Sequence, residues 1–228
     1  MVSAEKENRY PCDQVVPIEQ EPRHHLLIEN EFVRAFAVEI APHDRTLCHH
    51  HPHDYLMYVA GDAEIISAAR EQEPKRLSYS DGECELLSAG MVHVVENLGQ
   101  KPFRNVVVEL QPRSAVLRRG VGPKLIRGDA RITPHFKDDR AAIFVVELAS
   151  DAEVEIAGPA VIATPYRTVL NPEYPGRIRA KANPISDLAW MPADERLILS
   201  GTASAGRKAV IFMIGVRSDE GLGGVEPS

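Results

Sequence analysis

The sequence predicts an all-β protein built as a sandwich or a barrel. Short runs rich in Val, Ile and Phe recur along the chain, for example 32-FVRAFAVEI-40, 55-YLMYVA-60, 63-AEIISAA-69, 103-FRNVVVEL-110 and 208-KAVIFMIG-215. Pro, Gly, Asp and Asn separate these runs at short intervals, as turns separate strands. Seventeen prolines also argue against long helices, because proline breaks a helix interior.

The runs divide the chain into five segments. Residues 1–23 are polar and punctuated by proline, and we expect them to form an N-terminal arm along the outside of a barrel. Two similar β-units follow, over 24–112 and 141–216, because 36-FAVEIAPHDRTL-47 is faintly repeated at 144-FVVELASDAEVEI-156. A basic linker over 113–140, with a short helix near 114–119, joins them, and 217–228 form a flexible tail. A single long sandwich is the alternative.

Composition and charge exclude several classes of partner. The net charge of −7 argues against nucleic acid, since phosphate binding needs clustered Lys and Arg. No apolar run reaches the length of a membrane span, and the first residues lack the apolar core of a secretion signal. Three cysteines, Cys12, Cys48 and Cys84, form no CxxC pair and fit a reducing compartment better than a disulfide framework. We therefore expect a cytoplasmic protein without nucleic-acid or membrane partners.

The stretch 48-CHHHPHDY-55 holds four of the nine histidines. In an extended strand alternate residues face the same side, so His49 and His51 share one face, while Cys48 and His50 share the other. His53 has the parity of His49 and His51, but it follows the turn at Pro52. This parity favours Cys48 as a buried neighbour over a ligand. Metal sites use three or more protein ligands, so a further ligand must come from elsewhere in the fold. We interpret His24, His25, His43 and His135 as surface or satisfied core histidines.

Two stretches resemble the sequence motifs of the cupins. In 82-GECELLSAGMVHVVEN-97, Gly82, Gly90, His93 and Asn97 fall at the spacing of the second motif, with Ser88 in place of its proline. The stretch 42-PHDRTLCHHHP-52 is similar to the approach to the first motif, with His43 at the usual glycine. The resemblance implies a double-stranded β-helix, or jelly roll, in two tandem barrels. It also implies that His49, His51 and His93 are the metal ligands.

One ligand of the family pattern is missing. The metal-binding glutamate falls at Tyr55 when the motif is aligned on the histidines, and at Asp54 when it is aligned on Gly61. We prefer the first alignment and expect three neutral imidazoles around the metal. The additional candidates, as ligands or as neighbours of the ligands, are Asp54, Tyr55 and His53.

Strand parity predicts the residues of the pocket, and the internal repeat, with 36–51 aligned on 144–159, predicts that the second unit has lost the site. Met57, Met91 and Val95 share the face of the ligands and are expected to line an apolar pocket. In the second unit Ala157 and Pro159 stand where His49 and His51 stand in the first, so we expect a structural barrel without a metal.

Three-histidine sites occur among the cupin dioxygenases, and the resemblance therefore suggests an Fe(II)-dependent dioxygenase acting on a small anionic molecule. One divalent ion per chain is expected, with Fe(II) favoured over Zn, Mn and Ni. A metal-dependent isomerase or decarboxylase, and a non-catalytic binding protein, are the alternatives. We also expect a homodimer, because exposed strand edges are commonly covered by a partner.

Overall fold

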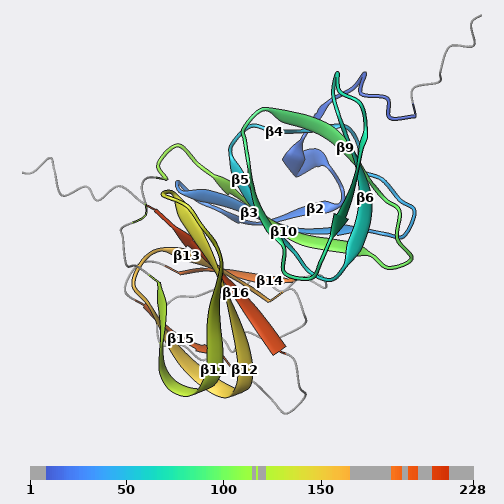
Figure 1. The fold of residues 1–228 in the computed structure, drawn as a ribbon. Coiled ribbons are helices and arrows are strands. Elements are labelled where there is room, and N and C mark those ends of the chain that lie inside the picture. Colours follow the sequence, from blue (N-terminus) through green and yellow to red (C-terminus); the bar gives the residue numbers. More distant parts are fainter. Residues whose placement is uncertain are drawn as a thin grey trace, which may run out of the picture. The chain divides into compact units, whose positions relative to one another are not determined.

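The computed structural model is built almost entirely of β-strands (Figure 1). It describes residues 9–114, 117, 122–164, 186–191, 195–199 and 207–215. The predicted tail and most of the predicted helix near 114–119 lie outside these residues. In the described part of the chain, no helix is long and apolar enough to cross a membrane. Because strands make up nearly all of the described secondary structure, the predicted all-β class is confirmed.

The chain divides into two compact units. The first contains Met1–Leu26 and Phe36–Val107, and the second contains Leu27–Ala35 and Val108–Ser228. The turn between Glu29 and Val33 thus belongs to the second unit, although it precedes most of the first unit in sequence.

The first unit has two five-stranded sheets whose inner faces supply one core. One sheet has the order β1 (Val16–Pro17), β4 (His49–His51), β9 (Met91–Asn97), β6 (Ala63–Ala69) and β7 (Lys75–Tyr79). The other has the order β2 (His24–Glu29), β3 (Val33–Ile40), β10 (Phe103–Leu110), β5 (Tyr55–Val59) and β8 (Cys84–Leu87). Apolar side chains from both sheets, such as Phe36, Ile65 and Val95, pack in that core. Two sheets closing over a shared core form the predicted jelly roll.

Turn residues of the cupin-like motifs fix the connections of this barrel. Gly82 and Gly90 have φ values of 88° and 85°, in the left-handed region that side chains with a Cβ disfavour. His43 takes the same conformation, with φ 59°, at the position where glycine is usual in the motif. The Asn97 amide donates hydrogen bonds to the backbone oxygens of Ile40 and Lys101, which ties β9 to two neighbouring turns.

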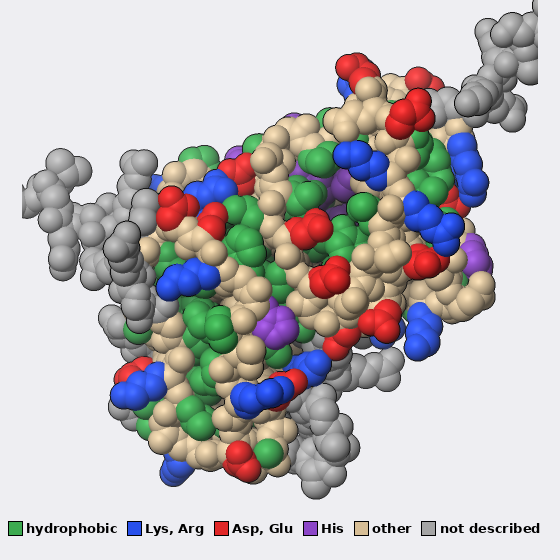
Figure 2. Space-filling view, viewed as in Figure 1, with side chains coloured by type: hydrophobic (Ala, Val, Ile, Leu, Met, Phe, Trp, Pro, Cys, Tyr) green, Lys and Arg blue, Asp and Glu red, His purple; other side chains and the backbone are tan. Residues whose placement is uncertain are grey.

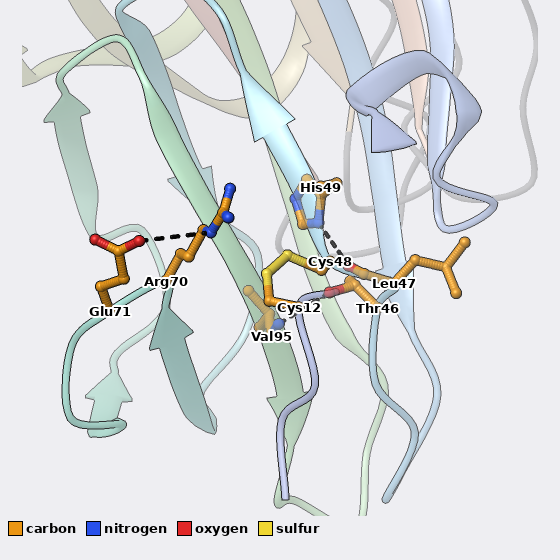
Figure 3. The surroundings of a disulfide bond; sticks show 8 residues. All are labelled: Cys12, Thr46, Leu47, Cys48, His49, Arg70, Glu71 and Val95. Atoms are coloured by element: carbon orange, nitrogen blue, oxygen red, sulfur yellow. Dashed lines mark hydrogen bonds and ion pairs between the residues drawn. A yellow bond between two sulfur atoms is a disulfide. The ribbon is translucent and has the colours of Figure 1, made fainter. Parts of the chain in front are cut away.

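The N-terminal segment covers the outer face of β4, β9 and β6. Tyr10 packs there against Cys48, Ala68 and Val94. Cys12 and Cys48 form a disulfide with their Cα atoms 5.3 Å apart (Figure 3). The prediction that the cysteines form no disulfide was therefore wrong, because the N-terminal segment returns to the strand beside Cys48. Cys84 is the free cysteine of the described residues.

Removing the disulfide is expected to destabilise the first unit. The bond joins residues 36 positions apart, and closing a loop of this size stabilises a folded state by about 4 kcal/mol. A Cys12→Ser variant should therefore unfold at lower denaturant than the oxidised parent, and at the same denaturant as the dithiothreitol-treated parent. Cys84→Ser is the matched control, which should unfold like the parent. Identical unfolding of the oxidised and reduced parent would contradict the bond.

The second unit contains one extended sheet. Its strand order is β11 (Pro123–Lys137), β12 (Ala141–Ile156), β16 (Arg207–Ile214), β13 (Ala160–Thr164) and β14 (Asp187–Met191), and β15 (Glu195–Leu199) pairs with β12. Buried residues such as Val146, Ile162 and Ile211 form its core. Phe32 from the β2–β3 turn stacks on Trp190, with ring centroids 5.8 Å apart.

Strand β11 corrects the interpretation of 113–140 as a linker. Residues Pro123–Lys137 pair antiparallel with β12 along nearly their whole length. Three register shifts interrupt the pairing, so the residues that face the core do not alternate regularly. Leu125, Ala130 and Ile132 nevertheless pack against the core. The irregular register and the basic composition together hid this strand from a reading based on periodicity.

Candidate metal centre

Four buried histidines from three strands meet inside the first unit. His49 and His51 lie on β4, His93 lies opposite His49 on β9, and His24 begins β2. The His49 ring centroid lies 4.6 Å from that of His24, 5.1 Å from that of His51 and 4.7 Å from that of His93. His50, between the two β4 ligand candidates, is only half-buried, as strand alternation requires.

Three of these histidines could hold a metal ion. The ligand-capable nitrogens of His24, His49 and His51 all lie within 4.8 Å of one another, and all three residues are buried. The predicted ligand His93 borders this group, with its ring centroid 5.3 Å from that of His51. Its Nδ1 lies 3.3 Å from the Ser67 hydroxyl. The structure thus places the three predicted histidines together and adds His24.

The hydrogen bonds of His49 prepare one of its nitrogens for a metal. His49 Nδ1 lies 2.9 Å from the backbone oxygen of Leu47, which can only accept a hydrogen bond. The proton therefore sits on Nδ1, and Nε2 carries a lone pair. His49 Nε2 is fully buried and has no hydrogen-bond partner among the residues that the structure describes. A buried imidazole lone pair without a partner is the arrangement that a metal ion would satisfy.

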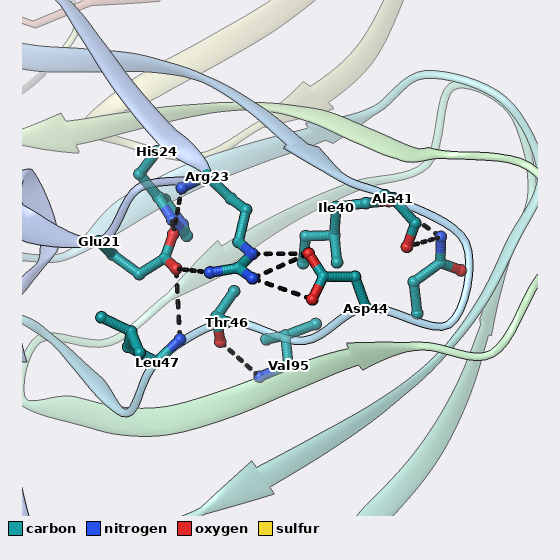
Figure 4. A network of polar contacts seen from close by, with 10 residues as sticks. Glu21, Arg23, His24, Ile40, Ala41, Asp44, Thr46, Leu47 and Val95 are labelled. Carbon is teal, nitrogen blue, oxygen red and sulfur yellow. Dashed lines mark hydrogen bonds and ion pairs between the residues drawn. The ribbon is translucent and has the colours of Figure 1, made fainter.

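A buried carboxylate orients His24 in the same way (Figure 4). Glu21 Oε2 accepts hydrogen bonds from His24 Nδ1 at 2.8 Å and from the Arg23 backbone nitrogen at 2.7 Å. The other oxygen, Oε1, accepts from the Leu47 backbone nitrogen at 3.2 Å. Burial raises the pKa of Glu21, but these hydrogen bonds and the electrostatic interaction with His24 outweigh it and hold that pKa at about 2. The carboxylate therefore keeps the His24 proton on Nδ1 and leaves Nε2 to face the cluster.

Burial keeps the other imidazoles neutral, as metal ligands must be. Burial, followed by the nearby His24, lowers the pKa of His49 to about 4. Burial and the surrounding histidines also lower the pKa of His51 and of His93 well below the ordinary value.

The remaining candidates from the sequence occupy other positions. Tyr55 is buried and stacks on His51, with ring centroids 4.1 Å apart and planes 18° apart. Asp54 Oδ1 accepts a hydrogen bond of 2.6 Å from the Ala89 backbone nitrogen in the loop before β9. His53 is half-buried in the bend between β4 and β5. Whether any of these three contacts a bound metal stays a prediction.

His24 is the residue that sequence reasoning missed. It was interpreted as an ordinary surface or core histidine because it lies outside both motifs. The local signal was an acid three residues earlier, Glu21, which forms the carboxylate–histidine pair seen in the structure. That spacing alone is too common to distinguish a ligand from a surface ion pair.

A cavity of about 260 Å³ opens beside the cluster. His24, His51 and His93 form part of its wall, and most of the rest is apolar, including the predicted Met57, Met91 and Val95. Histidine surface is visible in Figure 2 in a hollow among hydrophobic side chains, in the upper part of the view. The cluster therefore faces a space that can receive a small molecule.

Fold and site together define a class of two-unit β-proteins with a histidine cluster in one barrel. No model of a known protein family and no curated protein matches the sequence. Solved structures do match. Salicylate 1,2-dioxygenase from Pseudaminobacter salicylatoxidans superposes with a TM-score of 0.51 and 11% identity, over 84% of this chain and 76% of that chain. AerE from Microcystis aeruginosa matches with a TM-score of 0.51 and 12% identity, over 85% and 98% of the two chains.

Vicilin from Solanum melongena is similar with a TM-score of 0.50 and 12% identity, over 82% of this chain and 76% of that chain. These likenesses show that the chain has the cupin fold, and the resemblance inferred from the two motifs is confirmed at that level. At such low identity they establish the fold alone. A dioxygenase and a vicilin share it, so the activity must be argued from the site.

The metal-free protein is expected to lose stability as the pH falls below about 6.5, the ordinary pKa of histidine. Because the pKa of His49 is about 4 in the folded state, the unfolded chain binds a proton there that the folded chain does not. For His49 alone, this linkage lowers the free energy of unfolding by about 1 kcal/mol between pH 7.5 and 5.5. His51 and His93 act in the same direction, whereas Glu21 contributes only below its unfolded value of 4.5.

Thermal unfolding of the chelator-treated protein at pH 7.5, 6.5 and 5.5 measures this effect. A His49→Gln variant should show a smaller decrease in Tm over the same range, because it lacks one of the groups responsible. A Tm independent of pH in the parent would contradict burial of neutral imidazoles.

Proposed function

We propose that the protein is a metal-dependent enzyme, a dioxygenase-type oxidoreductase that binds one Fe(II) ion and acts on a small anionic molecule. The proposed ligands are His24, His49 and His51, with His93 beside them as a further ligand. The observation that carries the proposal is the buried lone pair of His49 Nε2 within a cluster that borders a cavity.

The donor set fits a divalent transition metal. Imidazole nitrogens suit Fe, Zn, Mn and Ni, and neutral ligands leave the positive charge of the ion undiminished. An anionic group on the substrate is therefore attracted to the site. Three or four nitrogens also leave coordination positions open for exogenous molecules. Bound Fe(II) would supply the redox chemistry with dioxygen that the protein side chains cannot provide.

The residues of the chain perform the other tasks. Glu21 and the Leu47 carbonyl hold His24 and His49 in the orientation that points Nε2 at the cluster. The Ser67 hydroxyl lies beside His93 and can orient its ring. Apolar walls, including Met57 and Val95, exclude bulk water and restrict the positions that a substrate can take.

The test is anaerobic loading of the metal-free, full-length protein with Fe(II), followed by elemental analysis and addition of nitric oxide. One equivalent of iron, with the half-integer-spin EPR signal of a ferrous nitrosyl complex, would support a ferrous site with an open position. His50→Ala on the same strand is the control and should behave like the parent. Tight zinc binding without a ferrous nitrosyl signal would exclude the dioxygenase and favour an isomerase or decarboxylase. Absence of any stoichiometric metal would exclude the site.

A further inference from the structure

The cavity wall contains a buried amide oxygen that has no hydrogen-bond partner among the described residues. The inward residues of β10 are Phe103, Asn105 and Val107, and all three line the cavity. Asn105 is 5% exposed, and its Oδ1 is fully buried without a hydrogen bond from the described residues. A buried polar atom left unpaired in this way costs stability, so a partner supplied from outside the chain would be favourable.

The amide lies two strands from His24 in the same sheet, because β3 lies between β2 and β10. Glu39 of β3 contacts both Arg23 and Arg104. His51 stacks on Tyr55, at the first residue of β5. The Ala60 backbone nitrogen, just beyond the last residue of β5, donates to the Arg104 oxygen at 2.9 Å. Asn105 therefore lies beside the last residues of β5, four residues or about 13 Å along the strand from Tyr55, but only about 10 Å across the sheet from His24. A ring-sized ligand can therefore place one end at the histidine cluster and the other end at Asn105.

The space between these two ends suits an apolar body larger than benzene. The cavity volume of about 260 Å³ exceeds the roughly 150 Å³ of an apolar cavity known to hold benzene. Its middle section is formed by side chains such as Met57, Ile65 and Phe103. A substituted ring fills such a volume without leaving polar atoms unpaired against apolar walls.

Charge in the cavity limits what the distal group can be. Glu73, Lys75 and Glu85 line the cavity, but Glu73 and Lys75 are exposed, whereas Glu85 is half-buried. Glu85 Oε2 accepts a hydrogen bond from the Tyr79 hydroxyl at 3.3 Å. A second anionic group on the ligand, away from the metal, would be repelled by this carboxylate. An uncharged hydroxyl or amide meets no such penalty. A hydroxyl both donates and accepts, so it can pair with either end of the Asn105 amide.

We propose that Asn105 is a specificity-determining residue that binds an uncharged hydroxyl or amide group at the distal end of the substrate. The substrate is then an apolar, ring-sized molecule with a metal-binding group at one end and this neutral polar group at the other. This inference rests on the proposed function, because the histidine cluster supplies the anchor for the first end.

The test uses three hydroxamates as probes of the full-length protein loaded with Zn(II), which is redox-inert. Benzohydroxamic acid offers only the metal-binding group, while its 4-hydroxy and 4-carboxy derivatives add a neutral or an anionic distal group. Isothermal titration should give about tenfold tighter binding of the 4-hydroxy compound than of the parent hydroxamate. The 4-carboxy compound should bind most weakly, because of Glu85. Asn105→Leu should abolish the preference for the hydroxyl while retaining affinity for benzohydroxamic acid.

Arg104→Gln is the matched control, since Arg104 lies on the same strand, pairs with Glu39 and is not part of the cavity wall. It should leave all three affinities unchanged. Equal binding of the parent and 4-hydroxy compounds, or a hydroxyl preference that survives in Asn105→Leu, would overturn the role of Asn105. If none of the hydroxamates binds, the open metal site of the proposed function fails instead.

A second measurement, made on the metal-free protein, tests the role of Asn105 independently. If the Asn105 amide is retained for a ligand, replacing it with leucine should raise the Tm of the metal-free protein by about 3 °C, because an unpaired polar group is removed. A lower Tm in Asn105→Leu would mean that the amide supports the fold, and the inference would be wrong.

Discussion

His49→Ala is expected to weaken metal binding by roughly a hundredfold or more. Structural zinc sites with four ligands bind with about 10–16 kcal/mol, so one ligand contributes roughly 3 kcal/mol. His49 occupies the centre of the group, within 5.1 Å of the ring centroids of both His24 and His51. Its buried Nε2 has no hydrogen-bond partner among the described residues, so the substitution removes a donor that is available to the metal. Competition with a chromophoric chelator measures the dissociation constant directly.

Metal-dependent stabilisation provides an independent measure of how His49→Ala affects metal binding. The parent should show a Tm that rises with metal concentration, because an ion that binds only the folded state stabilises that state by mass action. His49→Ala should lose most of this rise. His50→Ala, which alters the half-buried residue next in the strand, should keep it. Equal affinities for the two variants would place the metal elsewhere.

Glu21→Ala is expected to lower both stability and metal affinity. The carboxylate is 1% exposed and accepts hydrogen bonds from the His24 ring and from the backbone nitrogens of Arg23 and Leu47. Its removal leaves the buried His24 ring and two partly buried backbone nitrogens without this partner, at a cost of about 3 kcal/mol in the free energy of unfolding. Loss of the partner that orients His24 should weaken metal binding by about 10- to 100-fold.

Glu21→Gln separates the two effects. Glutamine keeps the shape of the side chain but offers a single acceptor oxygen, so part of the stability should return while His24 stays poorly oriented. Denaturant unfolding without metal and chelator competition with metal measure the two quantities separately. Asp13→Asn, an exposed acid in the same N-terminal segment, is the control for loss of negative charge. Parent-like metal affinity in both Glu21 variants would show that His24 needs no orientation.

Local patterns were sufficient to predict most of the first barrel. The run 63–69 and the run 103–110 became β6 and β10 with the same bounds, because apolar content and flanking turn residues are both local signals. Alternation alone assigned His49 and His51 to the buried face. His24 could not be found in this way, since it reaches the cluster through long-range folding and is held by a carboxylate that the motifs do not contain.

Two other features depended on contacts between distant segments. The bond between Cys12 and Cys48 requires the N-terminal segment to run parallel to β4, and the pairing of Val16 with His49 provides this. A count of cysteines carries no information about such an approach. Strand β11 was hidden because its register shifts break the alternation on which strand prediction depends.

The disulfide also bears on how the metal site assembles. Glu21 and His24 lie inside the loop that Cys12 and Cys48 close, and Cys48 is the immediate neighbour of His49. The crosslink therefore raises the effective concentration of His24 near the β4 histidines, so that its addition to the metal is an intramolecular chelation step. In the reduced protein the His24 nitrogen belongs to a segment with more conformational freedom, so bringing it to the metal costs more entropy. We expect metal retention to follow the thiol state of two residues that touch no metal.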